Sequence, residues 1–118
     1  MNIIRSNIDT NNKREVYRLT KSESKRVQDM ERGVSLPVKQ WCIYSETVKK
    51  KDGNTDTRTV LSVVVDGGVK IATISNTFIT SFLEIVDIMD DEPFSIIITG
   101  GTSKGGREYV NCELDCDG

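Results

Sequence analysis

The stretch that decides the fold spans residues 57–74 and reads Thr57-Arg58-Thr59-Val60-Leu61-Ser62-Val63-Val64-Val65-Asp66-Gly67-Gly68-Val69-Lys70-Ile71-Ala72-Thr73-Ile74. The β-branched residues up to Val65 predict a strand over residues 57–65. Asp66-Gly67-Gly68 predicts a tight turn, because glycine adopts positive φ without steric strain. Residues 69–74 then form a second predicted strand, antiparallel to the first.

A further strand is predicted upstream, over residues 38–48, from its aromatic and β-branched side chains. The lysines Lys49, Lys50 and Lys51 follow it and prefer water. Asp52-Gly53 then supplies a turn, so residues 49–56 read as a hairpin tip. Three strands joined by short turns form an antiparallel meander.

Downstream, apolar residues recur at helical spacing, which predicts an amphipathic helix over residues 77–90 with Ser75 or Asn76 as its N-cap. Pro93 ends this pattern. Two more strands follow, over residues 94–99 and 107–114.

This order, β-β-β-α-β-β, is that of the OB fold, a mainly β, five-stranded barrel with one helix between the third and fourth strands. Such barrels bind oligonucleotides or oligosaccharides across the second and third strands and the adjoining loops. Arg58, Lys70 and the lysines Lys49, Lys50 and Lys51 therefore join the candidate binding surface.

The N-terminal part carries weaker signals. Residues 1–14 are polar and lack an apolar period, which predicts a flexible arm outside the core. Residues 15–20 and 25–30 read as short strands, with a helix over residues 24–31 as the alternative for the second. We therefore expect an arm (1–14) and one OB-fold domain (15–118), whose core covers about residues 36–115.

Composition excludes several classes of function. The chain has 118 residues and no histidine, which removes Ser-His-Asp and Cys-His catalysis and histidine-containing zinc sites. Cys42, Cys112 and Cys116 form no Cys-x-x-Cys pair, so two core residues and one tail thiol are expected. We expect no enzyme, no cofactor and no metal. Without a signal peptide or a transmembrane run, the default location is the cytoplasm.

Charge is distributed unevenly along the chain. The net charge is −2, but residues 1–58 hold 13 basic and 8 acidic residues, against 3 and 10 in residues 59–118. A phosphate chain responds to the local field, so an acidic protein can still bind nucleic acid through a basic surface. Scattered solvating charges remain the alternative.

The richest candidate site is Gly100-Gly101-Thr102-Ser103-Lys104-Gly105-Gly106-Arg107-Glu108-Tyr109. It is no nucleotide-binding loop, because Lys104 precedes Gly105 and no helix follows. If Val110, Cys112 and Leu114 face the core, strand alternation puts Arg107, Tyr109 and Asn111 on the wetter face. Lys104, Arg107 and Tyr109 are thus predicted to contact phosphates and stack a base, although the glycines alone could serve a purely structural turn.

Trp41 and Tyr44 are further stacking candidates on the strand over residues 38–48. They have opposite parity, so both can face a ligand only if the strand bulges or one lies near its end. Packing in the core is the competing role for Trp41.

Four segments together carry a family resemblance: Asp66-Gly67-Gly68-Val69-Lys70, Ser75-Asn76-Thr77, Leu83-Glu84-Ile85-Val86-Asp87 in the helix, and Gly101-Thr102-Ser103-Lys104-Gly105-Gly106-Arg107-Glu108-Tyr109. The chain resembles small single-stranded DNA-binding proteins of bacteriophages that infect Gram-positive bacteria, in which Gly-Thr-Ser-(Ser/Lys)-Lys-Gly joins the last two strands. The resemblance covers about residues 36–115. It implies an OB-fold barrel that coats single-stranded DNA during replication without strong sequence preference, and carries over to the five loop residues 101–105 alone.

The expected partner is single-stranded DNA, with RNA left open, since phosphate and stacking contacts serve both. A homo-oligomer and a replication or recombination protein are further possible partners. The rival hypothesis is a protein-interaction adaptor of a phage or mobile element, in which the barrel recruits a protein without binding nucleic acid.

Overall fold

The computed structural model describes residues 1–102 and 104–117. These residues form a mainly β fold with two α-helices, α1 (Lys13–Thr20) and α2 (Asn76–Met89), and two short 3-10 turns, η1 (Val27–Asp29) and η2 (Asp66–Gly68). The strands are β1 (Asn2–Ser6), β2 (Lys25–Arg26), β3 (Ser35–Lys49), β4 (Thr55–Val65), β5 (Lys70–Thr73), β6 (Ser95–Thr102) and β7 (Glu108–Leu114).

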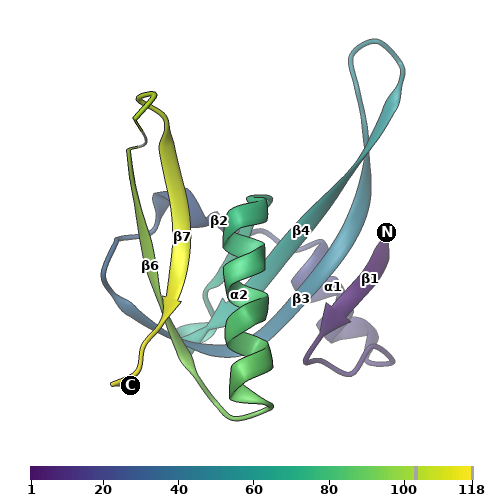
Figure 1. The fold of residues 1–118 in the computed structure, drawn as a ribbon. Coiled ribbons are helices and arrows are strands. Elements are labelled where there is room, and N and C mark those ends of the chain that lie inside the picture. The colour runs from purple at the N-terminus through teal and green to yellow at the C-terminus, as the bar shows by residue number, and fades with distance from the viewer. Residues whose placement is uncertain (103, 118) are drawn as a thin grey trace.

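The strands curl into a half-barrel in the order β2-β5-β4-β3-β6-β7, with β1 added beside β3 (Figure 1). All five predicted strands exist, as β3, β4, β5, β6 and β7, and the half-barrel fits the OB fold. The predicted count of five is wrong, because the described residues form seven strands. The predicted position of the helix also changes, since α2 follows the fifth strand in chain order and α1 precedes the second.

The longest strand, β3, connects the two parts of the half-barrel. Its first residues pair with β6, from Ser35 opposite Ile97 to Pro37 opposite Ser95. The rest pairs with β4, and the register shifts between Val38 and Gln40. Such a bulge bends a strand and increases its twist. β3 can therefore serve both neighbours while changing direction.

Helix α2 closes one face of this sheet. The Ser75 side chain accepts a hydrogen bond from the backbone N–H of Phe78 at 3.3 Å, which confirms Ser75 as N-cap. Phe78 and Phe82 are fully buried against strand residues such as Trp41 and Ile98. The helix ends at Met89, and Asp90, with a left-handed backbone (φ 47°), forms the C-cap.

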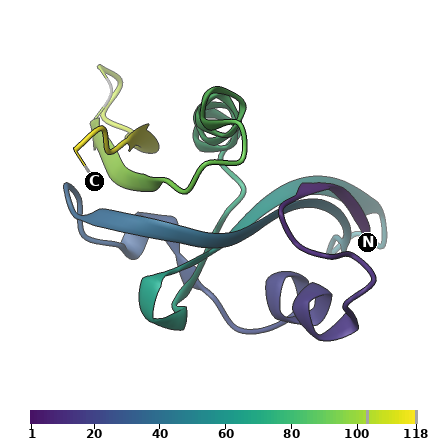
Figure 2. The same cartoon turned by 90° about the horizontal axis from the view of Figure 1, so that it is seen from below.

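The opposite face of β3 and β4 is covered by α1, so the two helices lie on opposite sides of the strands (Figure 2). Leu19 of α1 is fully buried and packs with Cys42, Tyr44 and Val64. This second apolar cluster also includes Val60, with Ile3, Ile8 and Ala72 packed against it.

Residues 1–14, expected to lie outside the core, instead include strand β1 and contact the second cluster. β1 pairs antiparallel with β3, from Asn2 opposite Ser45 to Ser6 opposite Cys42. Polar contacts hold the segment where no apolar period exists. The Asn7 side-chain oxygen accepts a hydrogen bond from the Trp41 backbone N–H at 2.7 Å, and Arg5 forms an ion pair with Asp87 of α2 at 2.6 Å.

The predicted strand over residues 15–20 is also wrong, because these residues belong to α1. The Asn12 side chain caps the helix by accepting from the Glu15 backbone N–H at 3.2 Å. Alternating and helical patterns are hard to separate over so few residues. Of the predicted strand over residues 25–30, only β2 is a strand, paired in parallel with β5, and η1 follows it.

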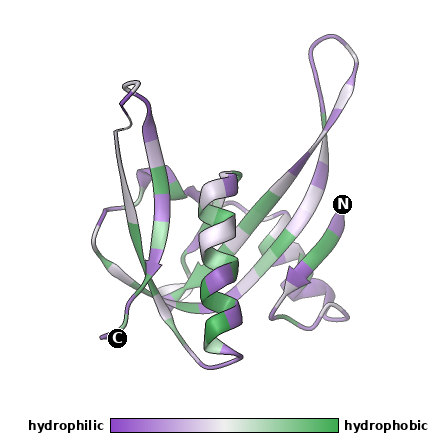
Figure 3. Cartoon of the chain, viewed as in Figure 1, coloured by the Kyte–Doolittle hydropathy of each residue, from purple (hydrophilic) through white to green (hydrophobic). Residues whose placement is uncertain are grey.

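Hydrophobic residues concentrate where α2 meets the strands, whereas the end of the β3–β4 hairpin is hydrophilic (Figure 3). Both α-helices in the described part of the chain are too short or too polar to cross a membrane.

Candidate nucleic-acid interface

Strands β6 and β7 form an arm that extends beyond the N-terminal end of α2 (Figure 1). We call β6, β7 and the described residues between them, 104–107, the β6–β7 arm. Lys104 and Arg107 are exposed there, and Gly106 has a positive φ of 80°, which suits a glycine in a turn. The motif residue Ser103 lies outside the described residues.

The predicted alternation along β7 is confirmed. Val110 and Cys112 are buried, whereas the Tyr109 side chain is 52% exposed. Asn111 is half-buried, and its side-chain oxygen accepts the backbone N–H of Cys112 at 2.9 Å. Tyr109 therefore lies on the wetter face of β7, and Arg107, just before the strand, and Lys104, in the connection, are both exposed.

Tyr109 lies opposite Gly101 in the pairing of the two strands. A Cβ placed on Gly101 would lie 3.2 Å from the Tyr109 hydroxyl oxygen and 3.5 Å from its Cζ. The phenol end of the ring therefore extends across β6, over a residue without a side chain. Gly100 differs, because its Cβ would lie 2.3 Å from the Tyr109 carbonyl oxygen and collide with the backbone itself.

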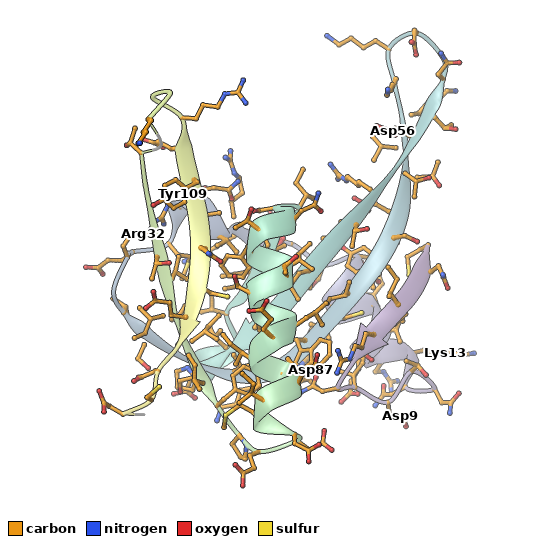
Figure 4. All side chains as sticks on the ribbon, in the orientation of Figure 1. Asp9, Lys13, Arg32, Asp56, Asp87 and Tyr109 are labelled. Atoms are coloured by element: carbon orange, nitrogen blue, oxygen red, sulfur yellow. The ribbon has the colours of Figure 1, made fainter. Side chains whose placement is uncertain are left out.

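A second projecting element is the lysine hairpin, which comprises Lys49, the end of β3, and the turn over residues 50–54. The turn closes with the Lys50 N–H donating to the Asn54 carbonyl at 2.7 Å, and Gly53 takes a φ of 87°. Lys49, Lys50 and Lys51 are all exposed, although Lys50 lies 3.7 Å from Asp56. The hairpin and the β6–β7 arm extend in the same direction (Figure 1). In Figure 4, Tyr109 marks the arm, and Asp56 of β4 marks the strand next to the hairpin.

Three other predicted residues, Tyr44, Arg58 and Lys70, meet in one groove of about 540 Å³. We call it the polar groove. It runs over β3, β4 and β5 on the side that α1 covers, and none of the described residues of the β6–β7 arm lines it. Its other wall comes from the segment around β2, with Ser22, Ser24, Arg26 and Gln28.

Hydrogen bonds fix the floor of this groove. The Lys70 ammonium donates to the Ser22 carbonyl at 2.8 Å, and burial lowers the pKa of Lys70 while the nearby Cys42 opposes that change. The Tyr44 hydroxyl donates to the Thr20 carbonyl at 3.2 Å. Burial is also the main reason that the pKa of Tyr44 is raised. Lys70 and Tyr44 thus hold the segment after α1 against the sheet.

Arg58 is more accessible than Lys70 in the polar groove. Its guanidinium contacts the Glu46 carboxylate at 2.6 Å through Nε and 2.5 Å through Nη2. This pair links β3 and β4 directly below the lysine hairpin. Arg26 at the opposite wall is exposed and lies 3.9 Å from Asp29.

Trp41 lies away from both surfaces. It is 4% exposed and packs in the main core, whereas Tyr44 is 5% exposed and packs in the second cluster. The two residues therefore lie on opposite faces of β3, as their parity predicts. The Arg5 guanidinium lies 5.9 Å from the centre of the Trp41 ring, which places a cation where a base would otherwise have to stack.

Arg32 is a cation near the β6–β7 arm that sequence reasoning missed (Figure 4). Its guanidinium donates to the carbonyls of Met30 at 2.7 Å and Gln28 at 3.2 Å. Its Nε lies 3.3 Å from the position of a Cβ on Gly100. The turn at Gly33, whose N–H donates to the Ile98 carbonyl at 3.1 Å, brings Arg32 to this arm. This contact joins residues far apart in the chain, so the sequence alone gives no signal that places Arg32 beside the β6–β7 arm.

The cysteines have the predicted distribution, with Cys42 and Cys112 buried and Cys116 exposed. Burial raises the pKa of Cys42 to about 11 and that of Cys112 to about 12. Both buried thiols are therefore protonated near neutral pH.

With the exposed tyrosine, the flanking cations and the half-barrel in place, comparison with known families is informative. A family model described as phage single-stranded DNA-binding protein matches residues 1–115. The chain belongs to this family. Searches of curated proteins and of solved structures gave no match.

Proposed function

We propose that this protein coats and protects single-stranded DNA, without sequence preference, during replication or recombination of a phage or mobile element in the host cytoplasm. Membership of the phage single-stranded DNA-binding family supports binding of this polymer. The observation that carries the proposal is the half-exposed Tyr109, which lies on the β6–β7 arm together with the exposed Lys104 and Arg107.

These residues supply two kinds of contact. Lys104 and Arg107 would neutralise phosphates and release condensed counterions, which makes affinity fall with salt. The Tyr109 ring would stack a base, and every base has a π-face, so stacking is tolerant of sequence. Neither contact reads the hydrogen-bonding edge of a base. Coating, rather than recognition of a site, follows from this chemistry.

The lysine hairpin and the polar groove extend the proposed surface. Lys49, Lys50 and Lys51 are exposed on an element that points the same way as the β6–β7 arm. Arg58 lines the polar groove. We include these cations as phosphate contacts. Lys70, Tyr44 and Trp41 we leave out as primary contacts, because all three are buried.

The direct test is fluorescence anisotropy with labelled oligothymidine, a duplex and an RNA of equal length, each at two salt concentrations. We expect the tightest binding to oligothymidine, with affinity decreasing steeply as the salt concentration rises. The logarithm of the binding constant should fall by about 0.7 per logarithmic unit of salt for each neutralised phosphate. Absence of binding to all three probes would contradict the proposal and favour the protein-interaction adaptor.

A further inference from the structure

Gly101 occupies a position where glycine is unfavourable on local grounds. It is the penultimate residue of β6, paired with Tyr109, and its backbone is not among those with positive φ. A strand residue without a side chain weakens its strand, and β-branched residues are favoured there. Gly106 contrasts with it, because that glycine has a φ of 80° and open space around it. Turn geometry therefore explains Gly106 and does not explain Gly101.

The space around Gly101 offers the explanation. The three atoms nearest to a Cβ on this residue all belong to the Tyr109 side chain, at 3.2, 3.5 and 3.6 Å. A Cβ at 3.2 Å is closer than most side-chain contacts in proteins, and a branched side chain would reach further. The ring would then have to shift from its position over Gly101. Because Tyr109 is 52% exposed, it has room to do so.

We propose that Gly101 is a positioning residue for Tyr109: by lacking a side chain, it lets the ring lie across β6, where the exposed part of the ring can receive a base. This inference rests on the proposed single-stranded DNA binding. Aromatic residues are known to cover glycines on neighbouring strands, which stabilises the pair. Here the same pairing fixes the direction of the ring and reduces the freedom that binding would otherwise remove.

The test is a double-mutant cycle with Gly101→Val and Tyr109→Ala, measured as the affinity for labelled oligothymidine and as Tm. Gly101→Val should weaken binding at least about fivefold, the lower end of one lost stacking contact. Its Tm should stay the same or rise, because valine suits a strand. In the Tyr109→Ala background, Gly101→Val should have no further effect on affinity.

Thr102→Val is the matched control, since it places the same valine at the next position of β6, opposite Glu108, where a β-branched residue is already present. It should leave affinity unchanged. Gly101→Ala repeats the test with a smaller side chain if the valine variant folds poorly. In both Gly101→Val and Gly101→Ala, NMR signals of the Tyr109 ring should shift.

The outcomes separate the inference from the proposed function. If Tyr109→Ala weakens binding and Gly101→Val does not, the positioning role is wrong and DNA binding stands. If Gly101→Val weakens binding equally in both backgrounds, the added side chain acts without Tyr109, which also overturns the role. If the unchanged protein fails to bind oligothymidine, the proposed function fails first.

Discussion

The ring of Trp41 packs edge-on against the ring of Phe82, with 5.6 Å between the centroids and 72° between the planes. This contact joins the middle of β3 to helix α2 inside the main core. Trp41, the one tryptophan of the chain, is thus a packing residue of the main core, and Arg5 of β1 lies against its ring.

Trp41→Ala should therefore affect stability rather than binding. Removing a buried aromatic side chain from a core typically lowers the free energy of unfolding by about 3–5 kcal/mol. Affinity for oligothymidine, measured where the variant is folded, should remain within about twofold of the original. Urea unfolding and anisotropy give the two quantities. Loss of affinity in a fully folded variant would return Trp41 to the interface.

The double substitution Lys104→Glu with Arg107→Glu should weaken single-strand binding sharply and reduce its salt dependence, because two phosphate contacts become repulsive. Both residues are exposed, so Tm should change little. Lys13→Glu with Arg14→Glu is the control, since it makes the same change in net charge on the exposed start of α1, remote from the arm in Figure 4. Equal losses in the two double variants would indicate a general charge effect.

Tyr109→Ala should weaken binding by about 1–3 kcal/mol, the range of one base–aromatic contact. Tyr109→Phe keeps the ring and should retain most of the affinity. Titration with oligothymidine at fixed salt checks both. An alanine variant that binds as tightly as the phenylalanine variant would show that the ring stacks no base.

Leu19→Ala should lower the free energy of unfolding by about 2–5 kcal/mol, because Leu19 is fully buried in the second apolar cluster. Tyr17→Ala serves as control on the same helix, since Tyr17 is 63% exposed. Chemical denaturation measures the difference. If both variants unfold like the original protein, α1 does not contribute to the core.

The thiols should react in two groups. At pH 8, Ellman's reagent should modify Cys116 in the folded protein and all three cysteines after unfolding, because the thiolate is the reactive form. The pKa values of about 11 for Cys42 and about 12 for Cys112 exceed the ordinary value of 9.0 that a thiol has in the unfolded chain. Burial of the two protonated thiols therefore contributes fully to the free energy of unfolding below pH 9, and this contribution is lost as the pH rises from 9 towards those values. Rapid reaction of more than one thiol in the folded state would contradict this.

The elements from β3 to β7 could be predicted from the sequence because each has a strong local signal. Val60 to Val65 form a nearly continuous β-branched run, Asp66-Gly67-Gly68 supplies the turn, and the apolar stripe of α2 has an N-cap in Ser75. The alternation that exposes Tyr109 is equally local.

The N-terminal segment could not be predicted in this way, because its order depends on distant partners. β1 is held by β3, by Asn7 at Trp41 and by Arg5 at Asp87. Distant partners also explain why the positions of some candidate site residues could not be predicted. Arg32 reaches the β6–β7 arm, and Lys70 reaches Ser22, through contacts between residues far apart in the chain.

The register shift between Val38 and Gln40 has a consequence for how much DNA one molecule would cover. It lies between the part of β3 that pairs with β6 and the part that continues to the lysine hairpin. If Lys104 and Lys50 both contact DNA, as proposed, the bend of this strand would set the span between them and with it the number of nucleotides in a footprint. Occluded site size would be controlled from a position that touches no DNA.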